Sequence, residues 1–270
     1  MKIGICAGAK QIAQLKTGMA DYAELNLSQV YEMTDGELKD TAMVLAACGV
    51  PAEAANGFFP AEVKLCGRLF DKNRVREYCK KALYNGAQLG IHTCVLGSGK
   101  ARYIDEGEQK ENCTKQLEEA ICIAGDAANE FGTTIVLEPL NKKETNVLNT
   151  VAEGAALCRK LHHPNVMLLA DIYHVALENE SLDEISKNGD ILRHVHIARP
   201  EGRLYPMEHD GFDYRTVKNA LDKAGYDLRI SVEGASPGDF VKSAEESLQF
   251  LKSGFHTDRA PAAAGPGIHS

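Results

Sequence analysis

The 270-residue sequence has no tryptophan, no Cys-x-x-Cys pair and no long apolar run. A transmembrane helix needs about 20 consecutive apolar residues, so none is expected. The first residues, 1–6 (MKIGIC), lack the apolar core of a signal peptide. Basic residues are also in deficit: 30 Lys and Arg against 38 Asp and Glu give a net charge of −8. Binding to a phosphate backbone depends on basic side chains, so we expect neither nucleic acid nor membrane as a partner.

The cysteines do not form a recognisable disulfide pattern. The chain has eight of them, several within apolar helix-like or strand-like segments such as 121–123 (ICI). Buried, reduced thiols are typical of proteins in a reducing compartment. The sequence therefore predicts a cytoplasmic protein with free cysteines.

Strand-like and helix-like segments alternate along the chain. The expected strands are 2–6, 22–27, 51–59, 91–96, 134–138, 166–171, 191–198 and 228–233. The expected helices are 11–19, 34–48, 73–90, 106–131, 149–162, 182–188, 214–224 and 239–251. Such alternation favours a parallel sheet, and this number of units predicts a single-domain α/β protein, a closed (β/α)8 TIM barrel over residues 1–254.

An open doubly wound sheet is the alternative fold. Its dinucleotide-binding form needs a glycine-rich turn after the first strand. Residues 6–10 (CAGAK) offer a single glycine there, so that fingerprint is absent. Residues 255–270 differ in composition from the rest, with the run APAAAGPG at 260–267. This segment is predicted to be a low-complexity C-terminal tail.

Four of the later expected strands carry a metal-ligating side chain at or near their end: Glu138, Asp171, His196 and Glu233. Each gap between them is about the length of one strand–helix unit, so each belongs to its own strand. The C-terminal ends of barrel strands meet at one mouth, where active sites lie. We therefore predict that these side chains converge on one divalent metal ion. Oxygen ligands with one imidazole suit Mn²⁺, which we favour, or Mg²⁺ or Co²⁺.

Four short motifs carry a family resemblance. They are 137–141 (LEPLN), 170–174 (ADIYH), 194–198 (HVHIA) and 232–234 (VEG). They resemble the xylose-isomerase-like barrel family of sugar isomerases and epimerases, in particular its ketose 3-epimerase and inosose isomerase branch. The resemblance extends from about residue 2 to residue 252.

The resemblance implies a role for each matching residue. Glu138, Asp171, His196 and Glu233 would bind one metal, and Glu138 and Glu233 would also be the catalytic acid/base pair. The substrate would be bound by three further residues: Glu144, His174 and Arg203. Arg203 is seven residues after His196, one more than in the family pattern.

The implied activity is metal-dependent epimerisation or isomerisation of a ketose. A proton next to the carbonyl would be removed and returned through an enediolate, with inversion at carbon 3 as the expected outcome. Glu138 and Glu233, at the ends of non-adjacent strands, could flank the substrate. The substrate would be a small sugar or cyclitol, and relatives of this kind form homo-oligomers, dimers or tetramers.

Other functions remain open at this stage. A lyase on the same scaffold, either an inosose dehydratase or a subunit cleaving 3-keto-C-glycosides, would begin with the same proton abstraction. An inactive sugar-binding barrel is the non-enzymatic alternative. A multi-zinc DNA-repair endonuclease would need further His and Asp ligands and a basic face. The segment 97–102 (GSGKAR) is expected to be a loop at the mouth, where Lys100 or Arg102 could contact a sugar or a phosphate.

Overall fold

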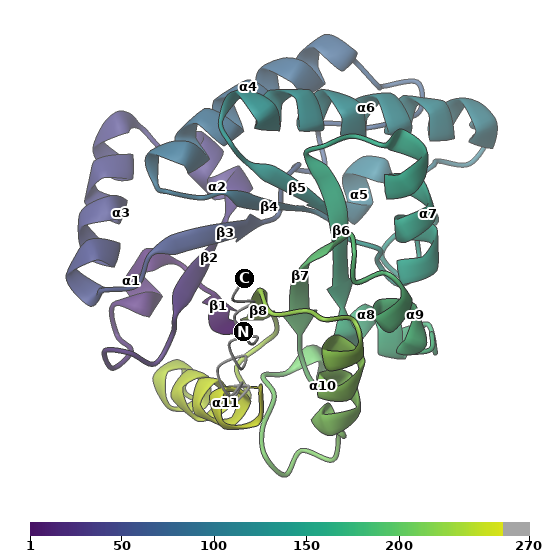
Figure 1. Ribbon diagram of the computed structural model, residues 1–270. Coiled ribbons are helices and arrows are strands. Elements are labelled where there is room, and N and C mark those ends of the chain that lie inside the picture. Colours follow the sequence, from purple (N-terminus) through teal and green to yellow (C-terminus); the bar gives the residue numbers. More distant parts are fainter. Residues whose placement is uncertain (256–270) are drawn as a thin grey trace, which may run out of the picture.

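The computed structural model describes residues 1–255, and its centre is a closed barrel of parallel strands (Figure 1). The strands run in sequence order around the barrel, and β1 pairs with β8 to close it. Their bounds are β1 Lys2–Cys6, β2 Tyr22–Asn26, β3 Ala52–Asn56, β4 Thr93–Leu96, β5 Thr134–Leu137, β6 Val166–Asp171, β7 Leu192–Ile197 and β8 Arg229–Val232. The predicted TIM barrel is confirmed, and the open-sheet alternative is excluded.

Helices surround the barrel on its outer side (Figure 1). Their bounds are α1 Ala9–Ile12, α2 Leu27–Glu32, α3 Asp35–Cys48, α4 Lys72–Gln88, α5 Gly99–Arg102, α6 Lys110–Glu130, α7 Val151–Leu161, α8 Ile172–Leu177, α9 Asp183–Lys187, α10 Tyr214–Lys223 and α11 Phe240–Phe255, with a 3₁₀ turn, η1, at Glu201–Arg203. The main hydrophobic core lies between these helices and the outer face of the barrel.

The inside of the barrel is divided into an apolar and a polar part. Val95, Val136 and Leu169, from β4, β5 and β6, form a separate small cluster. Leu169 is paired in register with His194 of β7, which bonds to Glu24 of β2 across the barrel. Because paired neighbours in parallel strands face the same side of the sheet, these side chains all point inward. The side of the interior formed by β2 and β7 is thus polar.

Some helix bounds agree with the sequence and others do not. Thr34 caps α3 and forms the predicted capping box with Glu37. The expected helix 11–19 is only a single turn, α1, which begins earlier, where the Gln11 side chain accepts a hydrogen bond from the Gly8 backbone N–H at 3.1 Å, and ends at the C-cap Ala13. The helix α2 was not predicted; it follows β2 directly because the side chain of Asn26 caps it.

The C-terminal helix extends further than expected. It runs to Phe255, which is buried and continues the apolar spacing of Leu248 and Leu251. The remainder of the predicted tail 255–270 lies outside the described residues. All eight cysteines are free in the structure. Within residues 1–255, no helix combines the length and apolarity needed to cross a membrane.

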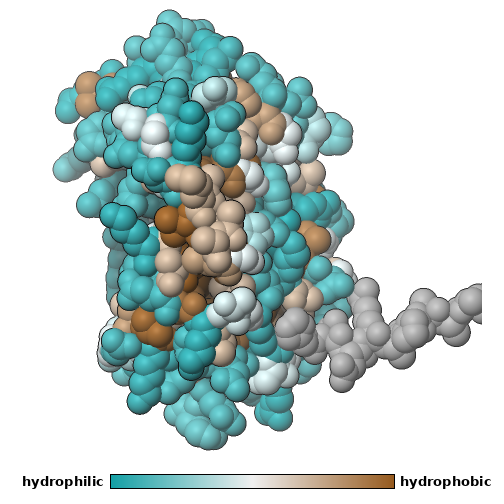
Figure 2. Space-filling model, turned by 90° about the vertical axis from the view of Figure 1, so that its left-hand side faces the viewer, coloured by the Kyte–Doolittle hydropathy of each residue, from teal (hydrophilic) through white to brown (hydrophobic). Residues whose placement is uncertain are grey.

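One face of the molecule carries a hydrophobic band. α3 lies at the left edge of Figure 1, and Figure 2 faces that side and shows apolar residues gathered along its middle. From α3, Met43, Ala46 and Ala47 are exposed. The homo-oligomer implied by the family resemblance stays a prediction, and this band is a surface on which it can be examined.

Gly4 offers a test of the polar interior. A Cβ at this position would lie 2.5 Å from the ring of Tyr22, which fills the barrel beside it. We expect Gly4→Ala to lower the free energy of unfolding by about 1–3 kcal/mol, because the ring or the strand must shift. Urea denaturation measures this change. The matched control is Gly36→Ala on α3, where the nearest atom to the new methyl lies 3.9 Å away. Equal stability of the two variants would contradict the packing described here.

Candidate metal centre

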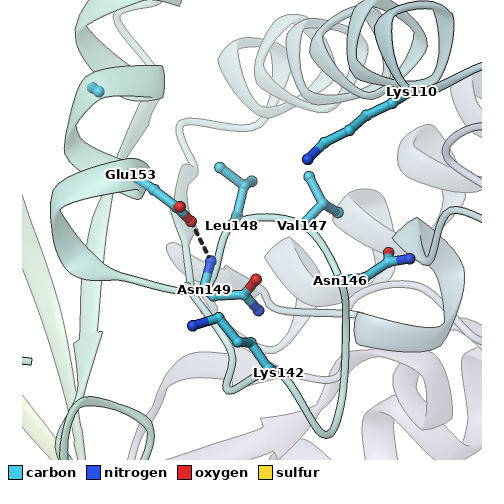
Figure 3. A pocket seen from close by; sticks show the side chains of 8 residues that line it. Lys110, Lys142, Asn146, Val147, Leu148, Asn149 and Glu153 are labelled. Carbon is cyan, nitrogen blue, oxygen red and sulfur yellow. Dashed lines mark hydrogen bonds between the residues drawn. The ribbon is translucent and has the colours of Figure 1, made fainter. Parts of the chain in front are cut away.

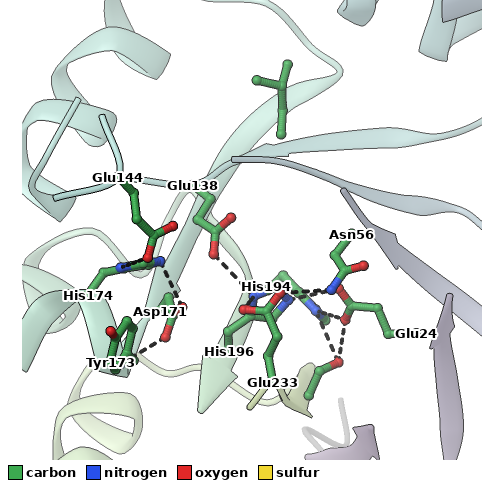
Figure 4. A network of polar contacts seen from close by, with 12 residues as sticks. Glu24, Asn56, Glu138, Glu144, Asp171, Tyr173, His174, His194, His196 and Glu233 are labelled. Atoms are coloured by element: carbon green, nitrogen blue, oxygen red, sulfur yellow. Dashed lines mark hydrogen bonds and ion pairs between the residues drawn. The ribbon is translucent and has the colours of Figure 1, made fainter. Parts of the chain in front are cut away.

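The structure brings the four predicted metal ligands together at the barrel mouth (Figure 4). Glu138 and Glu233 directly follow β5 and β8, Asp171 ends β6, and His196 lies in β7. One ligand atom from each side chain lies within 4.8 Å of those of the other three. Asp171 and His196 are fully buried, and Glu138 is nearly so. Parallel strand ends therefore gather the four groups, although the strands are distant in sequence.

Cationic side chains offset part of the negative charge. His196 Nδ1 lies 3.3 Å from a Glu138 oxygen and 3.2 Å from a Glu233 oxygen. Arg203 Nη2 lies 2.5 Å from Glu233 Oε2 and 3.3 Å from Asp171 Oδ2. Three closely spaced carboxylates thus face only two cationic groups, so negative charge is in excess at the mouth.

The pKa values show which carboxylates lack compensation. Burial, together with repulsion from Glu233 and Glu138, raises the pKa of Asp171 to about 8. Burial also raises the pKa of Glu138. The pKa of Glu233 is lowered despite its burial, because His196 and Arg203 lie beside it. A site in which carboxylates resist ionisation for want of positive charge is one that a divalent cation would stabilise.

The donor set fits such a cation. Three carboxylates and one imidazole are ligands that Mn²⁺, Mg²⁺ and Co²⁺ accept. The two nitrogens of His196 face different partners: Nδ1 faces the carboxylates, and Nε2 lies 2.8 Å from Glu24 Oε1. An ionised carboxylate only accepts hydrogen bonds, so Nε2 donates to Glu24. Nδ1 is then the nitrogen free to bind a metal once its own proton leaves.

His174 presents a hydrogen-bond donor to the same mouth. Its Nδ1 accepts from the Asn141 backbone N–H at 3.2 Å and lies 2.8 Å from the Asn141 side-chain amide. The proton of the neutral ring is therefore on Nε2, which is buried and lies 3.3 Å from Asp171 Oδ2 without the alignment of a hydrogen bond. Burial lowers the pKa of His174 to about 3, so the ring is neutral. A buried N–H without a partner is costly, and a ligand oxygen would satisfy it.

The other two predicted substrate-binding residues lie beside His174. Glu144 accepts a hydrogen bond from the Asn141 side chain at 3.0 Å and lies 3.4 Å from Arg203 Nη1. The Arg203 guanidinium also stacks on the ring of Tyr173 at 4.7 Å. The backbone of Arg203 has a positive φ of 48°, and the Arg203 carbonyl accepts a hydrogen bond from the N–H of Ala235 at 2.7 Å. The three residues thus form one polar wall next to the four ligands.

Arg102 does not contact the mouth as expected. It ends the short helix α5, is fully buried, and donates to the backbone carbonyls of Glu138 at 2.8 Å and Leu148 at 3.4 Å. The predicted sugar or phosphate contact through Arg102 is therefore wrong. Its guanidinium instead joins the end of β5 to the loop that follows, and so fixes the backbone that carries Glu138.

Sequence reasoning missed an inner layer of polar residues. Glu24 of β2 contacts both His194 and His196, and Ser231 of β8 donates to Glu24. Asn56 at the end of β3 donates to Glu233 Oε1 at 2.8 Å. The available signal was Glu24 itself: a carboxylate within an apolar strand must have partners if it is buried.

A separate cavity of about 690 Å³ lies outside the barrel (Figure 3). It is lined by residues of α6, α7 and the loop after β5: Lys110, Lys142, Asn146, Val147, Leu148, Asn149, Glu153 and Ala156. Glu153 accepts a hydrogen bond there from the Asn149 backbone N–H at 2.6 Å, and Lys142 forms an ion pair with Glu178 at 2.9 Å. None of the four candidate ligands lines this cavity, so it is distinct from the centre described above.

A closed (β/α)8 barrel with a carboxylate–imidazole cluster at its mouth defines the class of protein. The chain belongs to the xylose isomerase-like TIM barrel family, because the sequence pattern of that family matches residues 15–254. This confirms the resemblance drawn from the four sequence motifs.

The named relatives of the chain include sugar epimerases and putative hydroxypyruvate isomerases. The chain is 29% identical to a D-psicose 3-epimerase of Agrobacterium fabrum over 68% of its own length and 65% of the relative's. It is 38% identical to an L-ribulose 3-epimerase of Methylomonas over 56% of its own length and 51% of the relative's. The chain thus spans between half and two thirds of the length of these relatives. 

A solved structure shares the whole fold. D-psicose 3-epimerase from Clostridium cellulolyticum, crystallised with D-tagatose, superposes with a TM-score of 0.82 over 95% of this chain and all of that one. The identity is 20%, so this likeness concerns the fold alone.

Gly97 provides a test of the centre. It follows β4, and a Cβ there would collide with Glu138 Oε2. We expect Gly97→Ala to displace the Glu138 carboxylate and to weaken Mn²⁺ binding by about tenfold or more, as measured by titration calorimetry. Gly8→Ala at the N-cap of α1 is the control, because the nearest atom to its new methyl is 3.7 Å away. Unchanged Mn²⁺ affinity in Gly97→Ala would show that Glu138 is not a ligand in the position described.

Proposed function

We propose that this chain is a divalent-metal-dependent isomerase that epimerises a ketose at carbon 3. The observation that carries the proposal is the pair of carboxylates, the buried Glu138 and the partly buried Glu233, that reach one centre from non-adjacent strands. The sugar 3-epimerases among the relatives support the choice of reaction. Mn²⁺ is the ion we favour, with Mg²⁺ or Co²⁺ as alternatives.

The cation would be held by Glu138, Asp171, His196 Nδ1 and Glu233. When bound, it supplies positive charge that stabilises the negative charge developing on the substrate's carbonyl oxygen. The role of the protein is then to position the substrate, to exclude water and to move one proton.

Proton transfer is assigned to the two glutamates. Figure 4 shows Glu138 and Glu233 entering the centre from different sides. A carboxylate on one face of the ketose removes the proton next to the carbonyl, and the one on the other face returns a proton to the same carbon. The configuration of that carbon is thereby inverted. Removal of a proton from carbon 1 and return of a proton to carbon 2 would give aldose–ketose isomerisation instead.

Substrate recognition is assigned to the polar wall of Glu144, His174 and Arg203. The unpartnered Nε2–H of His174 would donate to a sugar oxygen. Glu144 would accept from a sugar hydroxyl, and Arg203 would donate to one. Hydrogen bonds to charged groups contribute about 1.5–3 kcal/mol each, enough to fix the orientation of a small sugar.

The proposal predicts exchange of a single substrate hydrogen with solvent. Ketoses incubated with the Mn²⁺-loaded protein in D₂O should gain deuterium next to the carbonyl, detected by NMR. Glu138→Gln and Glu233→Gln should each abolish this exchange, because an amide cannot take up the proton. Full exchange in both variants would refute the acid/base assignment.

Glu144→Gln is the matched control, since it is the same substitution at the same mouth. We expect it to raise KM by about tenfold or more and to retain exchange at saturating ketose, because Glu144 lies on the binding wall. The products also discriminate between reactions. A dehydrated or aglycone product in place of an epimer would assign the chain to the lyases of this scaffold.

We also propose a cellular location and an oligomeric state for the protein. The eight free thiols support a cytoplasmic location. A dimer or tetramer is proposed from the family alone.

A further inference from the structure

Glu24 forms a buried polar cluster behind the metal centre. It lies in the middle of β2, with an exposed fraction of 1%. Its carboxylate oxygens lie 2.8 Å from His196 Nε2 and 2.8 Å from His194 Nε2. Ser231 Oγ donates to Oε2 at 2.5 Å, and the hydroxyl of Tyr22 lies 2.7 Å from the same Ser231 oxygen. Figure 4 shows Glu24 on the side of His196 that faces away from Asp171.

The position of Glu24 sets how His196 can act. An imidazole has two nitrogens, and only one of them can face the three carboxylates of the mouth. The other, Nε2, is engaged by Glu24, which holds the ring plane and keeps the proton on Nε2. Nδ1 is thereby directed at Glu138 and Glu233.

Glu24 belongs with Cys6 and His196 to a second group of potential metal ligands, but both of its oxygens are already engaged by histidine and serine side chains. It is sealed inside the barrel beneath His196, so it does not touch a substrate in the mouth. Placing a carboxylate there is unfavourable unless its partners are fixed. Ser231 and His194 provide those partners from β8 and β7, so three strands hold the carboxylate in one orientation.

We propose that Glu24 is a positioning residue that orients His196 for the metal and raises the affinity of the centre for a divalent cation. This inference rests on the proposed function, because it assumes that the mouth binds a metal. A carboxylate behind a metal-bound histidine fixes the ring and makes the ligand nitrogen more basic. Ser231 and Tyr22 support Glu24 in turn.

The test is the dissociation constant for Mn²⁺, measured by titration calorimetry on the full chain after removal of bound metal. Glu24→Gln keeps the size of the side chain and removes its charge. We expect it to weaken Mn²⁺ binding by about 10–100-fold. The visible spectrum of the Co²⁺-loaded protein should change as well, because the imidazole is no longer held in place.

Glu53→Gln is the matched control. Glu53 is also a buried strand glutamate, but it lies near the start of β3 and pairs with Lys2 and Arg229 at the other end of the barrel. This control should lower the thermal midpoint and leave the Mn²⁺ dissociation constant unchanged. Ser231→Ala provides a second variant in case Glu24→Gln does not fold, and it should weaken Mn²⁺ binding severalfold.

The outcomes separate this inference from the proposed function. If the unmodified chain binds Mn²⁺ and Glu24→Gln binds it within twofold as tightly, the positioning role is wrong and the proposed function stands. Where Glu24→Gln does not fold, unchanged affinity in Ser231→Ala has the same meaning. An equal loss in Glu53→Gln would reduce the role of Glu24 to general stability. If the unmodified chain binds no divalent cation, both proposals fail.

Discussion

Holding Glu138, Asp171 and Glu233 together in a buried site is unfavourable, because like charges repel and burial removes the water that would screen them. His196 and Arg203 offset part of this repulsion, but burial and the two glutamates still raise the pKa of Asp171 to about 8. The barrel tolerates this concentration of charge because parallel strands bring their ends to one mouth while their hydrophobic outer faces pack against helices. A divalent cation would complete the compensation.

Other buried polar residues of the barrel hold these charged side chains in position. The barrel interior is apolar at β4, β5 and β6 and polar on the opposite side, where Glu24 engages His194 and His196. Arg102, fully buried, bonds to the backbone carbonyl of Glu138. Stability and function are therefore linked here, since the groups that fix the candidate ligands are also part of the core.

The barrel and the four candidate ligands could be predicted from sequence, because both depend on local pattern. Strand-like runs ending in Glu138, Asp171, His196 and Glu233 recur at one-unit spacing. Contacts across the barrel have no such local pattern. Glu24 resembles any strand glutamate until β7 is placed opposite it, and a charged Arg102 after a strand is expected at the surface, whereas backbone carbonyls hold it inside. The helix α2 was missed because its cap, Asn26, also ends β2.

The central claim is that the residues at the ends of β5 to β8 bind one divalent cation. Crystals of the protein soaked in Mn²⁺ and measured at the manganese absorption edge test it most directly. The account predicts a single strong anomalous peak within bonding distance of Glu138, Asp171, Glu233 and Nδ1 of His196. A peak bound elsewhere, or none at the mouth at saturating Mn²⁺, would contradict it.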